Sequence, residues 1–113
     1  MTAKQPNERI YNKLVRDRIP EIIASTGDTA VARVLDEAQY RTELERKLME
    51  ECGEALQTDV TSERLEELAD ILEAVTALAA LEGATFDEVA ELARQKREKR
   101  GGFGARIFLE KVF

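Results

Sequence analysis

Histidine and tryptophan are absent from this sequence of 113 residues, and cysteine occurs only once. Without histidine, the chain has neither the imidazole ligands of common zinc sites nor the base of Ser-His and Cys-His nucleophile systems. One cysteine allows no internal disulfide, which favours a reducing cytoplasm. No apolar run approaches the ~20 residues of a membrane span, and the N-terminus lacks the apolar core of a secretory signal. We therefore expect one cytoplasmic domain over residues 1–113, without a membrane partner, whose chemistry uses carboxylates, lysines, arginines or a hard metal ion.

The charges are unevenly distributed along the chain, whose formal net charge is −6. Residues 36–73 contain thirteen acids and four bases, whereas residues 94–113 contain seven bases and two acids. The acidic balance argues against a nucleic-acid partner, because affinity for a duplex comes largely from neutralising its phosphates. An acidic centre between basic ends suits a cation in the middle and an anion held by the ends. The alternative is a solvated acidic helix pair with a basic tail.

The pattern of apolar residues and helix-capping residues predicts an all-α protein. We expect a short helix after Asp17, which would cap it, with Pro20 in its first turn. Three longer helices are expected over residues 37–57, 63–82 and 86–100, with Ser62 and Thr85 as caps of the last two. Residues 30–35 are either a short strand or an extended connector, and the apolar residues 107–109 should pair with that segment or pack on the core. Residues 1–9 are expected to be flexible.

The second and third helices carry acidic pairs spaced three residues apart, Glu51 with Glu54 and Glu67 with Asp70. Each pair shares one helix face, and helices joined by a short turn are antiparallel neighbours, so the two pairs should face each other. Four carboxylates at low dielectric need protons or cations. Oxygen ligands alone favour Mg²⁺ or Mn²⁺. The alternative is four exposed acids paired with Lys47 or Arg64.

Four runs of the sequence resemble one protein family. These are YNKLVRDRIPEII (residues 11–23), KLMEECGEAL (47–56), EELADILEAV (66–75) and KREKRGGFGARIFL (96–109). Together they are similar to the all-α nucleoside triphosphate pyrophosphohydrolases, in particular to the MazG-like and phosphoribosyl-ATP pyrophosphohydrolase type of predicted house-cleaning enzymes. The resemblance implies Mg²⁺-dependent cleavage of a nucleoside triphosphate between the α and β phosphorus atoms, which yields a monophosphate and pyrophosphate.

The resemblance also implies roles for individual residues. Its metal-binding pattern falls on Glu51, Glu54, Glu67 and Asp70. Glu50 precedes this pattern and is either an outer-sphere ligand or base, or a surface acid; Glu50 or Glu54 would orient the attacking water, so that the catalytic set is Glu50, Glu51 and Glu54. Basic residues near both ends would bind the triphosphate, namely Lys13, Arg16, Lys96, Lys99 and Arg100. For the last three, the alternative is a favourable interaction with the helix dipole.

The family's fold is a four-helix, bundle-like MazG-type arrangement with short extended ends, completed by dimerisation. The apolar faces of residues 65–81 also predict a homodimer, and the resemblance implies dimers or dimers of dimers. In such an assembly the basic tail of one subunit can reach the acids of the other. Two other functions remain open: a dedicated phosphoribosyl-ATP pyrophosphohydrolase, and a non-catalytic helical dimer that binds nucleotides. Tyr11 and Tyr40 can stack on a nucleobase, but we expect both in the core.

Overall fold

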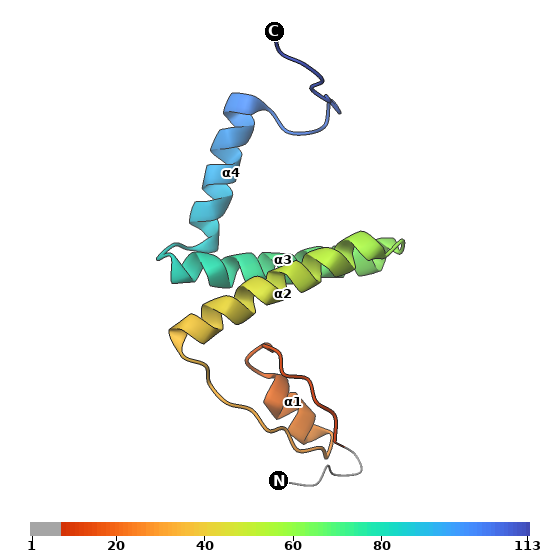
Figure 1. Cartoon of the computed structure of the whole chain (residues 1–113), viewed down its shortest axis with the longest axis vertical. Coiled ribbons are helices and arrows are strands. Elements are labelled where there is room, and N and C mark those ends of the chain that lie inside the picture. Colours follow the sequence, from red (N-terminus) through yellow and green to blue (C-terminus); the bar gives the residue numbers. More distant parts are fainter. Residues whose placement is uncertain (1–7) are drawn as a thin grey trace.

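The computed structural model describes residues 8–113 and consists of four helices without a strand in that part of the chain. They are α1 (Ile19–Ser25), α2 (Glu37–Gln57), α3 (Thr61–Leu81) and α4 (Phe86–Arg100), in the order seen in Figure 1. The predicted all-α class is confirmed. Most of the segment expected to be flexible lies outside the described residues. Within them, no helix is both long and apolar enough to cross a lipid bilayer.

An antiparallel hairpin of α2 and α3 forms the centre of the molecule (Figure 1). Its buried apolar residues are Leu44, Ala55, Ala74 and Ala79. Three of these four are alanines, whose small side chains let the two helix backbones approach closely. The hairpin therefore has a thin apolar seam rather than a thick core, and polar side chains next to the seam come within reach of the opposite helix.

Arg64 closes the turn between these two helices. Its Nε donates to the carbonyl oxygen of Ala55 at 3.0 Å, and its Nη2 donates to the carbonyl oxygen of Thr58 at 2.5 Å. These acceptors lie at the C-terminal end of α2, where backbone carbonyls have no partner within the helix. Arg64 is therefore a capping residue of α2. The structure does not show it paired with the acidic residues at positions 51, 54, 67 and 70.

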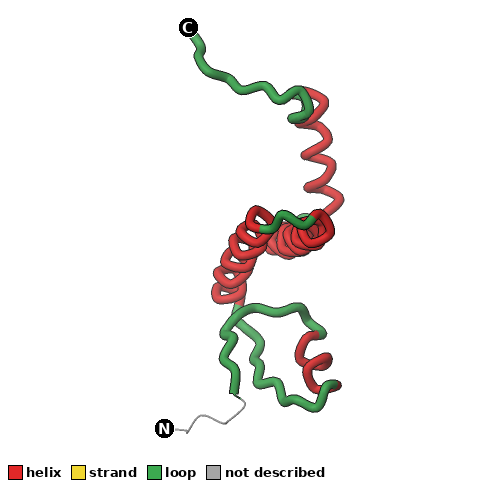
Figure 2. Tube along the Cα trace, turned by 90° about the vertical axis from the view of Figure 1, so that its right-hand side faces the viewer, coloured by secondary structure: helices red, strands yellow, loops and turns green. Residues whose placement is uncertain are grey.

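The other two helices stand away from the hairpin. Helix α4 contacts only α3, and α1 packs against none of the other helices (Figures 1 and 2). The radius of gyration is 19.1 Å, whereas a compact chain of this length has about 13 Å. The accessible surface is 10322 Å², against roughly 6,200 Å² for a folded monomer of this mass. The four helices therefore do not close into a bundle within a single chain.

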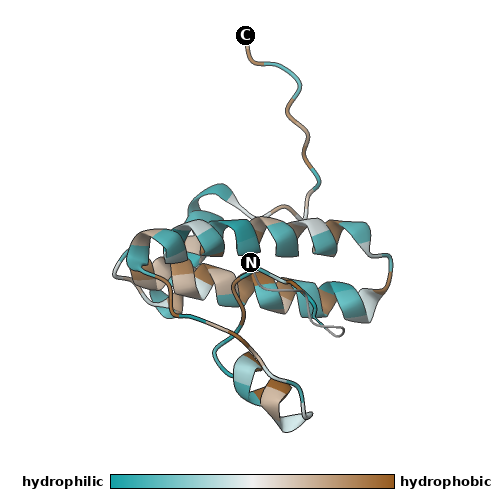
Figure 3. Ribbon diagram, turned by 60° about the horizontal axis from the view of Figure 1, so that its bottom comes forward, coloured by the Kyte–Doolittle hydropathy of each residue, from teal (hydrophilic) through white to brown (hydrophobic). Residues whose placement is uncertain are grey.

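Segments outside the helices decide between two alternatives at residues 30–35 and correct one expectation for the tail. Residues 30–35 form an extended connector rather than a strand. Ile107, Phe108 and Leu109 are exposed on a tail that leads away from the helices, where Figure 3 shows hydrophobic stretches in brown. The expectation that these three residues pair with the connector or pack on the core is wrong for the single chain, because α4 directs the tail away from the hairpin.

Two of the three predicted helix caps are also wrong. Helix α1 begins after Arg18, not Asp17, and no side chain caps it, although Pro20 does lie in its first turn. Helix α3 begins after Val60, two residues before the predicted start, so Ser62 lies inside the helix. The third prediction is confirmed, since Thr85 and Glu88 form a reciprocal capping box at the start of α4.

The contributions of Thr85 and Ser62 to the free energy of unfolding can be compared by substitution. Thr85→Ala removes a side-chain acceptor from the backbone N–H of Glu88, and we expect it to lower the free energy of unfolding by about 1 kcal/mol. Ser62→Ala removes no cap and should leave that free energy nearly unchanged. Urea denaturation followed by circular dichroism measures both variants, and equal losses would contradict the assignment of Val60 as the cap position.

Candidate metal centre

Five carboxylates from α2 and α3 meet across the middle of the hairpin. Oxygen atoms of Glu50, Glu51 and Glu54 lie within 4.8 Å of one another, and so do oxygen atoms of Glu51, Glu67 and Asp70. Glu51 belongs to both groups and joins them. The structure therefore brings together all four residues of the predicted metal-binding pattern and adds Glu50 to them. We refer to these five residues as the carboxylate cluster.

Glu51 is the most buried member of the cluster. Only 5% of its surface is exposed, and it is the only charged residue among the buried ones in the described part of the chain. The Oε2 atoms of Glu51 and Glu67 are buried, and no N–H or hydroxyl group of the described residues donates a hydrogen bond to them. Buried polar atoms nearly always have a partner, since leaving one without any costs free energy. Two such oxygens next to each other mark a place suited to a proton or a cation.

The local sequence explains why the two carboxylates can meet. Ala55 follows Glu51 by one helical turn, and Ala74 follows Glu67 by two turns, so each alanine lies on the same face as its glutamate. Both alanines are buried in the seam between the helices. Larger residues at these positions would push the helices apart and separate the carboxylates.

The buried Glu51 and the half-buried Glu67 shift each other's pKa in opposite directions. The hydrogen bond with Glu51, together with burial and the nearby charge of Glu54, raises the pKa of Glu67 from 4.5 to about 7. Burial acts to raise the pKa of Glu51, but hydrogen bonds with Glu67 and Lys47 outweigh it and lower that pKa. The proton shared in this hydrogen bond therefore stays on Glu67 to a higher pH than on an ordinary glutamate.

Lys47 is a member of the site that the sequence analysis considered only as a salt-bridge partner. Its Nζ lies 3.2 Å from Oε1 of Glu51 and 3.7 Å from Oε1 of Glu50. Burial acts to lower the pKa of Lys47, but the three neighbouring glutamates of α2 outweigh it and raise that pKa. The spacing of four residues between Lys47 and Glu51 is the signal that could have identified this contact. Lys47 occupies one oxygen of Glu51 and leaves the other for Glu67.

Two of the predicted phosphate-binding residues also reach the cluster. Nη2 of Arg16 donates to Oδ1 of Asp70 at 2.5 Å, and Nζ of Lys13 lies 3.9 Å from Oε1 of Glu50. Both cations come from the segment before α1, which is separated from the acids by more than thirty residues of sequence. This segment thus places two positive charges at the rim of the carboxylate cluster.

The three predicted basic residues of α4 are not brought to this site within one chain. Lys96, Lys99 and Arg100 are exposed on the second half of α4, which points away from the hairpin (Figure 1). Among the described residues, no ion pair connects them with the carboxylate cluster. Their predicted role depends on a second copy of the chain.

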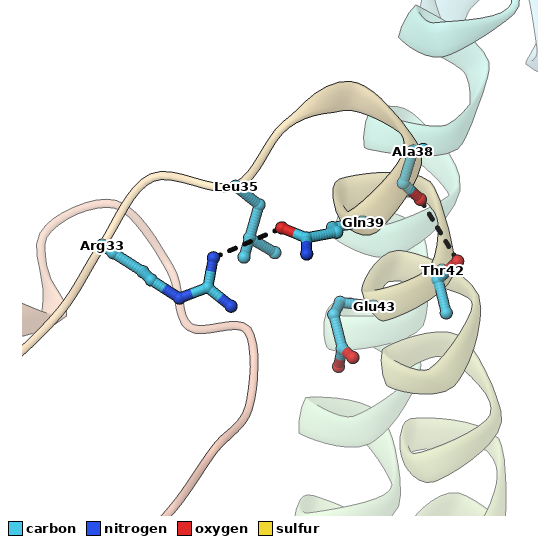
Figure 4. A pocket seen from close by; sticks show the side chains of 6 residues that line it. All are labelled: Arg33, Leu35, Ala38, Gln39, Thr42 and Glu43. Carbon is cyan, nitrogen blue, oxygen red and sulfur yellow. Dashed lines mark hydrogen bonds between the residues drawn. The ribbon is translucent and has the colours of Figure 1, made fainter.

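A shallow groove lies beside the first turns of α2, between that helix and the connector (Figure 4). Its volume is about 290 Å³, and its lining consists of Arg33, Leu35, Ala38, Gln39, Thr42 and Glu43. Nη1 of Arg33 donates to Oε1 of Gln39 at 3.3 Å, and Glu43 pairs with Arg46 at 3.0 Å. Glu43 precedes Glu50 by two helical turns, roughly 10 Å along the axis. The groove therefore opens on the same face of α2 as the cluster.

Comparisons with known proteins leave the family of this chain open. No protein-family model matches it, and no solved structure does. A stretch of 54 residues is 44% identical to an uncharacterized protein of Mycolicibacterium smegmatis. This match covers 48% of the present chain and 55% of that protein, so the chain spans about half the length of the curated relative it matches. The similarity carries no description of an activity.

The raised pKa of Glu67 makes the stability of the fold depend on pH. Because the pKa of Glu67 is raised from 4.5 to about 7, the folded protein binds more protons than the unfolded chain between these values. Stability without metal should therefore fall as the pH rises through this window. The lowered pKa of Glu51 acts with the opposite sign, but only in more acidic solution. Melting temperatures measured from about pH 5 to about pH 8 in a chelator test this.

Glu67→Gln is the decisive variant for this prediction. This variant should remove most of the fall in melting temperature with rising pH, and it should have a higher melting temperature than the unmodified protein at the upper end of the pH range. Glu66→Gln, at the exposed neighbouring position, should keep the behaviour of the unmodified protein. A melting temperature that rises through the window, or an equal decline in the Glu67 variant, would show that the two carboxylates do not share a proton.

Proposed function

We propose that the protein is a Mg²⁺-dependent nucleoside triphosphate pyrophosphohydrolase that removes nucleotides from the pool by cleaving them to monophosphate and pyrophosphate. The observation that carries this proposal is the pair of buried carboxylate oxygens on Glu51 and Glu67, to which no N–H or hydroxyl group of the described residues donates a hydrogen bond, within a cluster of five acids. The resemblance of the sequence to the all-α pyrophosphohydrolases supplies the reaction, and the cations at the rim of the cluster are consistent with a polyanionic substrate.

The donor set fits a hard divalent cation. All members of the cluster offer oxygen ligands, and among the described residues no sulfur or nitrogen ligand belongs to either metal-competent group. Such a set favours Mg²⁺ or Mn²⁺ over softer metals. Glu51, Glu54, Glu67 and Asp70 would hold the ion. Bound there, it supplies positive charge that offsets the charge of the triphosphate and of the departing pyrophosphate.

The chain's own residues have distinct roles in the proposed reaction. Arg16 and Lys13 bind phosphate oxygens at the rim, where each is now paired with a carboxylate. Glu54 is the better candidate to orient the water and accept its proton, because Glu50 is already held by Lys13 and Lys47, whereas Glu54 has no ion pair among the described residues. The water oxygen bonds to the α-phosphorus while the bond to the bridging oxygen breaks, and pyrophosphate leaves with that electron pair.

The reaction is tested by product analysis. Purified protein is incubated with ribo-, deoxy- and modified nucleoside triphosphates, and with phosphoribosyl-ATP, in the presence of Mg²⁺ or Mn²⁺. We expect monophosphate and pyrophosphate, with turnover reduced by at least ~100-fold in Glu51→Gln and Asp70→Asn, because each removes a charge that holds the ion. Glu73→Gln, an exposed acid of α3 outside the cluster, is the matched control and should retain full activity.

Other products would lead to other conclusions. Diphosphate with orthophosphate would keep the metal site but contradict cleavage between the α and β phosphorus atoms. A strong preference for phosphoribosyl-ATP would assign the protein to that dedicated reaction. An absence of turnover, together with a melting temperature that Mg²⁺ does not change, would favour the non-catalytic nucleotide-binding dimer.

We also propose that the molecule functions as a homodimer or a dimer of dimers. Leu65, Leu68 and Leu72 form one stripe along α3 and are 62%, 45% and 50% exposed. The accessible surface exceeds that of a compact monomer by about 4,000 Å², enough to supply a large interface between subunits. A second copy packed on this stripe would complete a bundle, and its α4 could bring Lys96, Lys99 and Arg100 to the phosphates.

Light scattering tests the assembly. At micromolar concentration we expect the mass of at least two chains. Leu72→Lys places a charge in the stripe and should reduce the mass to that of one chain, since burying an unpaired charge is costly. Val31→Lys adds the same charge to the exposed connector and should leave the mass unchanged. A single-chain mass for the unmodified protein would exclude the dimer.

A further inference from the structure

We propose that Tyr11 is the residue on which the nucleobase of the substrate stacks. The proposal deepens the proposed function, because it assumes that the phosphates of a nucleotide bind at the carboxylate cluster. Tyr11 is 64% exposed, so the expectation that it packs in the core is wrong, whereas Tyr40 on α2 is half-buried. An aromatic ring that the fold leaves uncovered beside the site is available to a ligand.

The ring is connected to the carboxylate cluster through a single side chain. Nζ of Lys13 lies 5.9 Å from the centre of the Tyr11 ring and 3.9 Å from Oε1 of Glu50. Lys13 is therefore close to both the aromatic ring and the acids. A base attached to phosphates that Lys13 and Arg16 bind would lie near these two residues, and the Tyr11 ring is the aromatic surface next to Lys13.

The chemistry of the ring suits the base of a nucleotide. Every nucleobase has a flat π surface that stacks on an aromatic side chain, and this contact tolerates different bases. Aromatic residues make up only 5% of the chain, and tryptophan and histidine are missing. In the described part of the chain, the ring of Tyr11 is the only one with a cation–π contact, and its cation is Lys13 at the rim of the cluster. A tolerant contact agrees with an enzyme that acts on several nucleotides.

The groove beside α2 is the rival position for the base, and the structure favours Tyr11 over it. No aromatic residue lines the groove (Figure 4). Its polar groups already have partners, since Gln39 accepts from Arg33 and Glu43 pairs with Arg46. A base entering there would have to displace these contacts, whereas stacking on the exposed ring of Tyr11 displaces only the distant Lys13 ammonium group.

The experiment distinguishes binding of the base from binding of the phosphates. The protein is labelled with 3-fluorotyrosine, so that its two tyrosines give two ¹⁹F resonances, which Tyr40→Phe assigns. Nucleoside monophosphates and, separately, inorganic tripolyphosphate are then titrated in the presence of Mg²⁺. We expect the Tyr11 resonance to shift much further with the nucleotides than with tripolyphosphate, which lacks a base and acts on the ring only through Lys13, while the Tyr40 resonance remains in place.

Variants give a second, independent measure. Tyr11→Leu should weaken nucleotide binding roughly tenfold without changing the affinity for tripolyphosphate, and Tyr11→Phe should retain the affinity for nucleotides because it keeps the ring. Gln39→Ala is the control in the groove and should bind as the unmodified protein does. Both positions, Tyr11 and Gln39, are exposed, and unchanged circular dichroism would show that the variants fold.

Three results would overturn the proposal: a Tyr11 resonance that no nucleotide moves, one that tripolyphosphate moves equally, or a loss of nucleotide affinity in Gln39→Ala instead of Tyr11→Leu. The last would place the base in the groove. Binding and turnover are measured separately, so the two proposals can fail independently. A Tyr11 response without hydrolysis would reject the reaction and keep the stacking role, whereas hydrolysis without a Tyr11 response would do the reverse.

Discussion

The meeting of Glu51 and Glu67 at the seam of the α2–α3 hairpin is the interaction on which the rest of the site depends. Two carboxylates withdrawn from water repel each other unless a proton or a cation lies between them. The hairpin meets this requirement in two ways. The hydrogen bond with Glu51 raises the pKa of Glu67 to about 7 and so favours a proton between the two carboxylates, and the ammonium group of Lys47 pairs with Glu51. In the proposed metal site, a divalent cation would take the place of both.

The basic side chains around the cluster also reduce the repulsion between its carboxylates. Lys47 pairs with Glu51 and Glu50, Lys13 also pairs with Glu50, and Arg16 pairs with Asp70. Lys13 and Arg16 hold the segment before α1 against the hairpin although α1 itself packs against no helix. In the proposed reaction these residues exchange a carboxylate partner for a phosphate. One set of charges thus serves both the folded state without ligand and the binding of a polyanion.

The loose arrangement of the four helices is also related to the proposed function. A thin seam of alanines brings acids within reach of each other, but it buries little apolar surface, and the leucine stripe of α3 stays exposed. A chain with this much uncovered apolar surface is expected to associate. The proposed dimer would therefore complete both the hydrophobic core and the ring of basic residues around the acids.

The sequence by itself determined the helices and the faces of their acidic residues. The bounds of α2, the capping box of Thr85 and the facing of Glu51 toward Glu67 follow from the 3.6-residue period and from side chains within a few positions, which are local properties. The caps at Asp17 and Ser62 were wrong because several residues in a turn can serve, and the path of the chain selects among them. Only the tertiary structure decided that Lys13 and Arg16 reach the acids, that Tyr11 stays exposed, and that α4 leads Lys96 away from them. These contacts depend on the course of an irregular connector, whose direction no periodic pattern encodes.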